Sequence, residues 1–292
     1  MSNNNIDRRN FLKVLSTGTA AASTGLLYGC GGDPKRQGVS QTGSYLGEVP
    51  TDKMTYRTNP HTGDKVSLLG YGCMRWPLRQ KADGSGEEID QEAVNALVDY
   101  AIAHGVNYFD VAPVYVRGLS EQATGLALSR HSRDKYFIAT KLSTHRPVPE
   151  WRTLEGSKGL FEQSLKNLRV DYIDYYLIHG VGLGGMDDLR KRLYDNGVLD
   201  FLLKERKAGR IRNLGWSFHG DVKVFDYLLS LDIPWDFVQI QLNYVDWKNA
   251  SGWNVNAEYL YGELEKRNIP VVIMEPLLGL SLIHISEPTR PY

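Results

Sequence analysis

Four side chains with complementary acid–base chemistry stand at or just beyond the ends of apolar segments: Asp110, Tyr115, Lys141 and His179. A tyrosine with its ordinary pKa of about 10 is a poor acid near neutrality, and a nearby lysine ammonium lowers that pKa. An aspartate keeps such a lysine charged and in place, and a histidine can hydrogen-bond a carbonyl oxygen. The set is suited to delivering a proton to a carbonyl group while a hydride arrives at its carbon.

Each of these residues also has a structural interpretation. Asp110 and Lys141 could form a surface ion pair, and His179 could be a hydrogen-bonded core histidine. The four together favour a reaction site, provided that the fold brings them to one place.

Strands and helices alternate along the chain, which predicts a parallel sheet. Helices are expected over 90–104, from about Ser120, over 156–167, up to 207, over 222–231 and over 256–267. Strands are expected over 69–74, 107–110, 136–141, 172–179, 214–218, 237–242 and 270–276, after a hairpin within 54–69. This α/β pattern predicts a (β/α)₈ TIM barrel with an N-terminal β-hairpin, interrupted before strand eight. No G-x-G-x-x-G stretch opens a helix after a strand, so a Rossmann dinucleotide site is not supported.

In such a barrel the active groups come from the C-terminal ends of the strands and the loops that follow them. Asp110, Lys141 and His179 end the second, third and fourth predicted strands, and Tyr115 lies in the loop after the second. The predicted fold therefore gathers the four residues at one mouth.

Several stretches of the chain resemble the aldo-keto reductase family. They are FDVAPVY (109–115), ATK (139–141), YLIH (176–179), GWSF (215–218), VQIQLN (238–243) and MEPLLG (274–279). Three positions depart from the family pattern: Val116 replaces a Gly, Phe218 an Asn and Met274 a Tyr. The resemblance covers about 54 to 279, the expected barrel.

The resemblance implies an NAD(P)-dependent oxidoreductase that moves a hydride between a nicotinamide and a carbonyl or alcohol substrate. Tyr115 would be the general acid, Lys141 the partner that adjusts its pKa, Asp110 the partner of Lys141, and His179 the group that orients the carbonyl. NADP is the family default, and NAD is possible. The implied cofactor-binding residues are Gly72, Cys73, Met74, Asp110, Ser217, Gln239, Met274, Glu275, Pro276 and Leu277.

Two tryptophans are expected near the substrate. Trp76 and Trp247 follow predicted strands one and six, where they could form a substrate wall or merely cover the barrel end. Two other functions stay open: a regulatory barrel that binds cofactor with little turnover, and a redox protein whose iron–sulfur segment is missing here. The chain has only two cysteines, so an iron–sulfur cluster requires a Cys-rich C-terminus that this sequence lacks, and no metal site is expected.

The first 30 residues are predicted to be an export signal rather than part of the folded domain. Arg8 and Arg9 precede a mildly apolar stretch that ends at Cys30, which resembles a twin-arginine lipoprotein signal with Cys30 as the lipidated residue. Residues 31–53 predict a flexible linker. The expected partners are the twin-arginine export machinery and a membrane reached through the lipid anchor. The expected location is the bacterial cell envelope, either the periplasm or as a membrane-anchored lipoprotein.

Charge and the C-terminal sequence complete the expectations. Lys and Arg number 34, as do Asp and Glu, which argues against nucleic acid as a partner.

Residues 280–292, LSLIHISEPTRPY, can be back-translated largely into a transposon-derived sequencing adapter. We therefore expect native sequence to end at Gly279 and the last residues to be a non-native tail.

Overall fold

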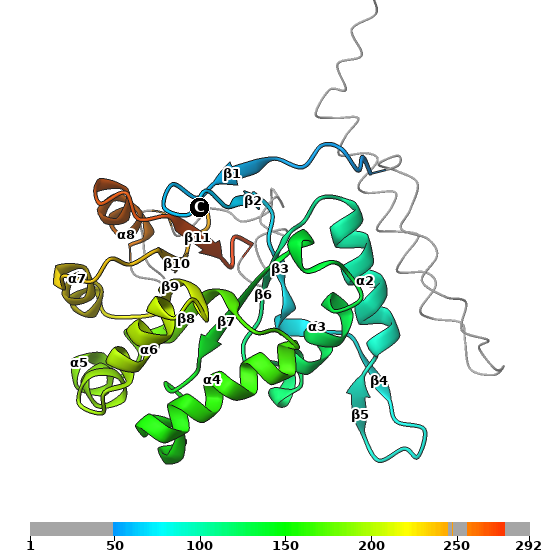
Figure 1. The fold of residues 1–292 in the computed structure, drawn as a ribbon, viewed down its shortest axis with the longest axis horizontal. Coiled ribbons are helices and arrows are strands. Elements are labelled where there is room, and N and C mark those ends of the chain that lie inside the picture. Colours follow the sequence, from blue (N-terminus) through cyan, green and yellow to red (C-terminus); the bar gives the residue numbers. More distant parts are fainter. Residues whose placement is uncertain (1–48, 245–246, 248–255, 278–292) are drawn as a thin grey trace, which may run out of the picture. The chain divides into compact units, whose positions relative to one another are not determined.

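A computed structural model describes residues 49–244, 247 and 256–277 (Figure 1). The predicted signal with Cys30, most of the predicted linker and the predicted tail of residues 280–292 lie outside the described residues.

Seven parallel strands form one sheet in the order β11-β10-β9-β8-β7-β6-β3. Their order in space follows their order in the chain, as it does in an α/β barrel. The strands are β3 (Tyr71–Gly72), β6 (Tyr108–Asp110), β7 (Phe137–Leu142), β8 (Ile173–Val181), β9 (Ile211–Phe218), β10 (Phe237–Gln241) and β11 (Val271–Met274). The predicted barrel class is confirmed.

Helices connect the strands and lie along the outer side of the sheet (Figure 1). They are α2 (Gln91–Ala103), α3 (Ser120–Leu128), α4 (Leu154–Leu168), α5 (Gly185–Leu189), α6 (Val198–Lys207), α7 (Val222–Ser230) and α8 (Ala257–Lys266), with a π-helical turn, η5 (Arg190–Tyr194), after α5. Asp90 caps α2 by accepting from the backbone N–H of Ala93. None of the helices in the described part of the chain is long and apolar enough to span a bilayer.

Side chains alternate across the sheet with period two. Tyr176 and Trp216 point outward and pack among helix residues such as Phe161 and Phe225. Tyr175 and Leu177 point to the other face, where they pack with Phe237. Because successive strand residues face opposite sides, Lys141 and His179 lie on the inner face, two positions beyond Ala139 and Leu177.

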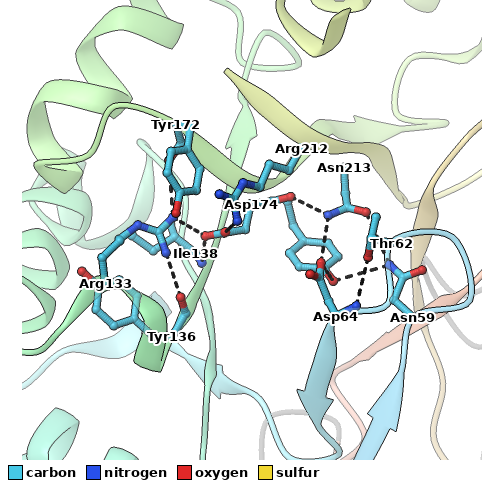
Figure 2. Close-up of polar contacts among 11 residues, drawn as sticks. Asn59, Thr62, Asp64, Arg133, Tyr136, Ile138, Tyr172, Asp174, Arg212 and Asn213 are labelled. Carbon is cyan, nitrogen blue, oxygen red and sulfur yellow. Dashed lines mark hydrogen bonds and ion pairs between the residues drawn. The ribbon is translucent and has the colours of Figure 1, made fainter. Parts of the chain in front are cut away.

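The predicted N-terminal hairpin is β1 (Tyr56–Thr58) paired with β2 (Lys65–Ser67). Its loop lies against the N-terminal ends of β8 and β9, as Figure 2 shows for Asn59, Asp64 and Asn213. Tyr175 donates from its hydroxyl to Asp64 at 3.0 Å, and Asn59 donates to Asn213 at 3.4 Å. The hairpin therefore covers the end of the sheet opposite to the one where the predicted catalytic residues stand.

One strand was predicted with the wrong length. The strand expected over 69–74 is reduced to Tyr71–Gly72, and a 3₁₀ turn, η1 (Cys73–Arg75), follows it. The helix expected from about Ser120 is α3, which begins at Ser120; the Ser120 hydroxyl donates to the Cys73 carbonyl at 2.6 Å. A further hairpin, β4 (Leu78–Gln80) and β5 (Glu87–Ile89), follows η1 and was not expected from the sequence.

Candidate active site

Lys141 lies at the centre of the candidate site. Its side chain is 2% exposed, and its ammonium donates to Asp110 Oδ1 at 2.5 Å, to the Val111 carbonyl at 2.9 Å and to the Tyr115 hydroxyl at 3.1 Å. An ammonium group has three N–H donors, so these contacts satisfy all of them. Since Lys141 donates to the phenolic oxygen of Tyr115, the hydroxyl hydrogen of Tyr115 stays available for another acceptor.

Tyr115 reaches Lys141 through an unusual turn. It begins η2 (Tyr115–Gly118), in which Val116 has φ 47° and Arg117 has φ 55°. Left-handed backbone is rare for non-glycine residues and strained for a β-branched one. Val116 is the residue that stands where the family has glycine, so this strain arises at one of the departures noted in the sequence.

Burial dominates the electrostatics of Tyr115. Burial raises the pKa of Tyr115, and the charge of Lys141 and its hydrogen bond counter that rise only in part. We expected Lys141 to bring the pKa below its usual value; the contribution has the expected direction, but the net shift is upward. Burial also lowers the pKa of Lys141, but Asp110 and Tyr115 raise it by more, so the ammonium stays charged. The arrangement is a protonated phenol held against a fixed cation.

His179 faces Tyr115 from β8. The two rings are perpendicular with centroids 6.1 Å apart, and His179 is 8% exposed. Burial, followed by the charge of Lys141 and then by His145, holds the pKa of His179 well below its usual range. His179 is therefore a neutral imidazole, which can donate one hydrogen bond and accept another.

Three residues that the sequence analysis missed support His179. Ser143 places its hydroxyl oxygen 2.7 Å from His179 Nδ1. Arg192, in η5 and fully buried, donates to the carbonyl oxygens of His179 at 3.1 Å and of Gly180 at 2.9 Å. Asp188 accepts from Arg192 at 2.9 Å. Of these three residues, only Ser143 could have been found from the sequence, because it follows Lys141 by two positions and so faces the same side of the sheet.

Ser217 and Gln239 are arranged to fit a carboxamide such as that of nicotinamide. Gln239 donates from Nε2 to Asp110 Oδ2 at 3.0 Å, and its buried Oε1 has no hydrogen-bond partner among the described residues. Ser217 accepts from the Gly180 N–H at 3.0 Å, which leaves its own hydroxyl hydrogen to donate. One free acceptor and one free donor complement the NH₂ and C=O of a carboxamide.

The other predicted cofactor residues lie near the ends of β3 and β11. Gly72 is exposed and Met74 is 52% exposed, so both are accessible. Cys73 is fully buried, and burial raises the pKa of its thiol, so the structure does not place it at an accessible surface. At the other edge, Met274 ends β11, and Glu275 follows it and accepts from Gln241 at 2.8 Å. Pro276 and the exposed Leu277 come next.

The two tryptophans have different environments. Trp76 is 4% exposed, stacks on Tyr71 and donates from its indole N–H to the Thr124 hydroxyl at 3.0 Å. This packing against α3 accounts for its burial without any substrate. Trp247 is half-buried, with its ring centroid 5.9 Å from that of Tyr261.

The comparisons with known proteins identify the family. The model of the aldo/keto reductase family matches residues 68–285, so the chain belongs to this family. The match passes Gly279, beyond which we expected non-native sequence. Protein tas from Escherichia coli is 31% identical over 205 residues, covering 61% of this chain and 56% of that protein. The chain thus spans about half the length of the curated relatives it matches.

Solved structures share the fold. Aldo-keto reductase AKR11C1 from Bacillus halodurans aligns with a TM-score of 0.60 at 24% identity, covering 82% of this chain and 70% of that one. An aldo-keto reductase of Bombyx mori, solved in complex with NADP, aligns with a TM-score of 0.54 at 20% identity, covering 82% and 71%.

Proposed function

We propose that this protein is an NADP-dependent oxidoreductase that interconverts a carbonyl and an alcohol, with Tyr115 as the general acid. The observation that carries the proposal is the contact of Lys141 with Tyr115 at 3.1 Å and with Asp110 at 2.5 Å. Family membership supports the reaction class, and the Bombyx mori complex supports NADP as the cofactor. NAD is the alternative.

Tyr115 gives a proton to the carbonyl oxygen. Its hydroxyl hydrogen is free because Lys141 already donates to the oxygen, and the fixed ammonium stabilises the phenolate that forms when the proton leaves. Asp110 keeps Lys141 charged in a buried position, where an unpaired ammonium would tend to lose its proton. In the reverse direction the same phenolate accepts the proton of the alcohol.

His179 orients the carbonyl as a neutral hydrogen-bond donor facing Tyr115. Ser217 and Gln239 hold the nicotinamide carboxamide, and Gln239 connects that contact to Asp110. When bound, the nicotinamide supplies the hydride for reduction of the carbonyl carbon.

Tyr115→Phe tests the proposal. The variant keeps the ring and removes the proton donor, so we expect the reduction of 4-nitrobenzaldehyde by NADPH to fall by about 10² to 10⁴, with cofactor affinity retained. Tyr108→Phe is the matched control, because Tyr108 is a buried tyrosine inside the sheet whose hydroxyl has no partner in the described region. Equal rates for the wild type and Tyr115→Phe would instead favour a regulatory barrel that binds cofactor with little turnover.

Export and anchoring form a separate proposal. We infer from RRNFLK and from LYGC at 27–30 that the protein follows the twin-arginine route and carries lipid on Cys30. That route carries folded proteins, so a cofactor bound before export can accompany the chain. Radiolabelled palmitate should label the full-length protein in cells but not Cys30→Ala, and Arg8→Lys with Arg9→Lys should keep it in the cytoplasm. Labelling of Cys30→Ala would contradict the anchor.

A further inference from the structure

Ser143 and His179 meet because of the register between β7 and β8. Lys141 pairs with Leu177 and Leu142 with Ile178 in these parallel strands. One more step of the same register brings Ser143 beside His179, with both side chains on the inner face. The result is the 2.7 Å contact between Ser143 Oγ and His179 Nδ1.

The direction of this hydrogen bond follows from burial. Ser143 is fully buried, and Nδ1 of His179 is the only side-chain partner of its hydroxyl in the described part of the chain. If Nδ1 carried the hydrogen and donated it, the hydroxyl hydrogen of Ser143 would have no acceptor there, and burying an unsatisfied donor is costly. Ser143 therefore donates, and Nδ1 accepts.

A neutral imidazole carries one N–H, so an accepting Nδ1 places the hydrogen on Nε2. Neighbouring residues also restrict the positions of the His179 backbone and ring. Arg192 holds its carbonyl oxygen, and the His145 ring lies 4.4 Å from its ring. The close approach of His145 depends on Gly180, where a Cβ would lie 3.0 Å from the His145 ring at a left-handed φ of 64°. Arg192 and His145 thus fix the backbone and ring positions of His179, and Ser143 determines which ring nitrogen carries the hydrogen.

We propose that Ser143 is a positioning residue that holds His179 in the tautomer with its hydrogen on Nε2, ready to donate to the substrate carbonyl oxygen. The expected effect on catalysis rests on the proposed function. The assignment of the His179 tautomer does not. In Ser143→Ala, Nδ1 loses its donor, and the tautomer with hydrogen on Nδ1 becomes competitive.

The first measurement needs no turnover. Long-range ¹H–¹⁵N spectra of the full-length protein, with His179 assigned by the loss of its signals in His179→Gln, distinguish the two neutral tautomers. We expect hydrogen on Nε2 in the wild type, a shift toward Nδ1 in Ser143→Ala, and recovery in Ser143→Thr, which keeps the hydroxyl. Ser157→Ala is the matched control: Ser157 is equally buried and donates to the Trp151 carbonyl at 2.9 Å, but it lies on α4 and not at His179.

The second measurement is the rate with NADPH and 4-nitrobenzaldehyde. We expect kcat to fall about fivefold to tenfold in Ser143→Ala with a smaller change in the Kd of NADPH, and to recover in Ser143→Thr. Hydrogen on Nδ1 in wild-type His179, or an Nε2 signal unchanged in Ser143→Ala, overturns the proposal. An unchanged kcat beside a shifted tautomer also overturns it. Failure of the proposed function appears separately, as a Tyr115→Phe variant with wild-type turnover.

Discussion

Gln239 in β10 donates a hydrogen bond to Asp110 in β6 at 3.0 Å, across the inner face of the sheet. The contact joins a residue proposed to hold the nicotinamide carboxamide to the carboxylate that pairs with Lys141. Asp110 thereby receives one hydrogen bond on each oxygen, from Gln239 and from Lys141. If Gln239 holds the carboxamide as proposed, this carboxylate links cofactor binding to the orientation of the acid–base pair.

Gln239→Leu should weaken cofactor binding. The change removes the free acceptor Oε1 and the contact with Asp110, while Lys141 still pairs with Asp110. We expect the Kd of NADPH, measured by fluorescence titration, to rise about tenfold, which corresponds to the loss of one or two hydrogen bonds. Gln163→Leu, on the exposed surface of α4, is the control. An unchanged Kd in Gln239→Leu would remove Gln239 from the cofactor site.

Arg192→Met should destabilise the fold. Arg192 is fully buried and holds two carbonyl oxygens at the end of β8, which the variant leaves without these donors. Asp188 keeps its ion pair with Arg152 at 2.8 Å, so the carboxylate is not left alone. We expect the free energy of unfolding in urea to fall by about 3 kcal/mol. Arg190→Met, at an exposed position of the same turn, should change it by less than about 0.5 kcal/mol.

His145 should make stability depend on pH. Burial, and then the charges of Arg192 and Arg146, lower the pKa of His145 to about 4. An unfolded histidine titrates near 6.5, so the unfolded chain binds a proton between about pH 6.5 and 4 that the folded chain excludes. The contribution of neutral His145 to the free energy of unfolding is therefore complete above pH 6.5 and is lost as the pH falls toward 4.

His145→Gln should reduce this loss, which urea unfolding between pH 7 and 4.5 can measure. His179 and His219 also have pKa values lowered by burial, so part of the slope remains in the variant. His61→Gln, at an exposed position, is the comparison. If the free energy of unfolding of the wild type falls with pH no more steeply than that of His145→Gln, His145 is not a source of the pH dependence.

Arg117→Gly should stabilise the turn after Tyr115. Arg117 has a left-handed φ of 55° and is 78% exposed in its side chain, so glycine relieves strain without loss of packing. The greater freedom of glycine in the unfolded chain offsets part of the gain, and we expect a net increase of about 0.5–1 kcal/mol in the free energy of unfolding. Arg75→Gly, in the 3₁₀ turn η1 that has no left-handed residue, should be destabilising instead. A decrease for Arg117→Gly equal to that of Arg75→Gly would show that the turn is unstrained.

The sequence by itself determined the sheet and the placement of its catalytic candidates. Strand and helix periodicities are local, and the C-terminal strand ends of a barrel meet at one mouth, so the sequence alone places Asp110, Lys141 and His179 together. The β4–β5 hairpin was missed because its strands of three residues carry no clear alternation. The 69–74 strand was predicted too long because Cys73 packs in the 3₁₀ turn η1 with residues of α2 and α3 rather than in the sheet, while Leu69 and Met74 are exposed.

Only the tertiary structure decided how these groups act. The pairing of Ser143 with His179 depends on the register of two strands, and that of Gln239 with Asp110 on positions 129 residues apart. The pKa of Tyr115 is raised because burial outweighs Lys141, a balance that requires the solvent exposure of every neighbouring atom. Residue types and spacing indicate which chemistry is possible; distances and burial determine which atom holds the proton.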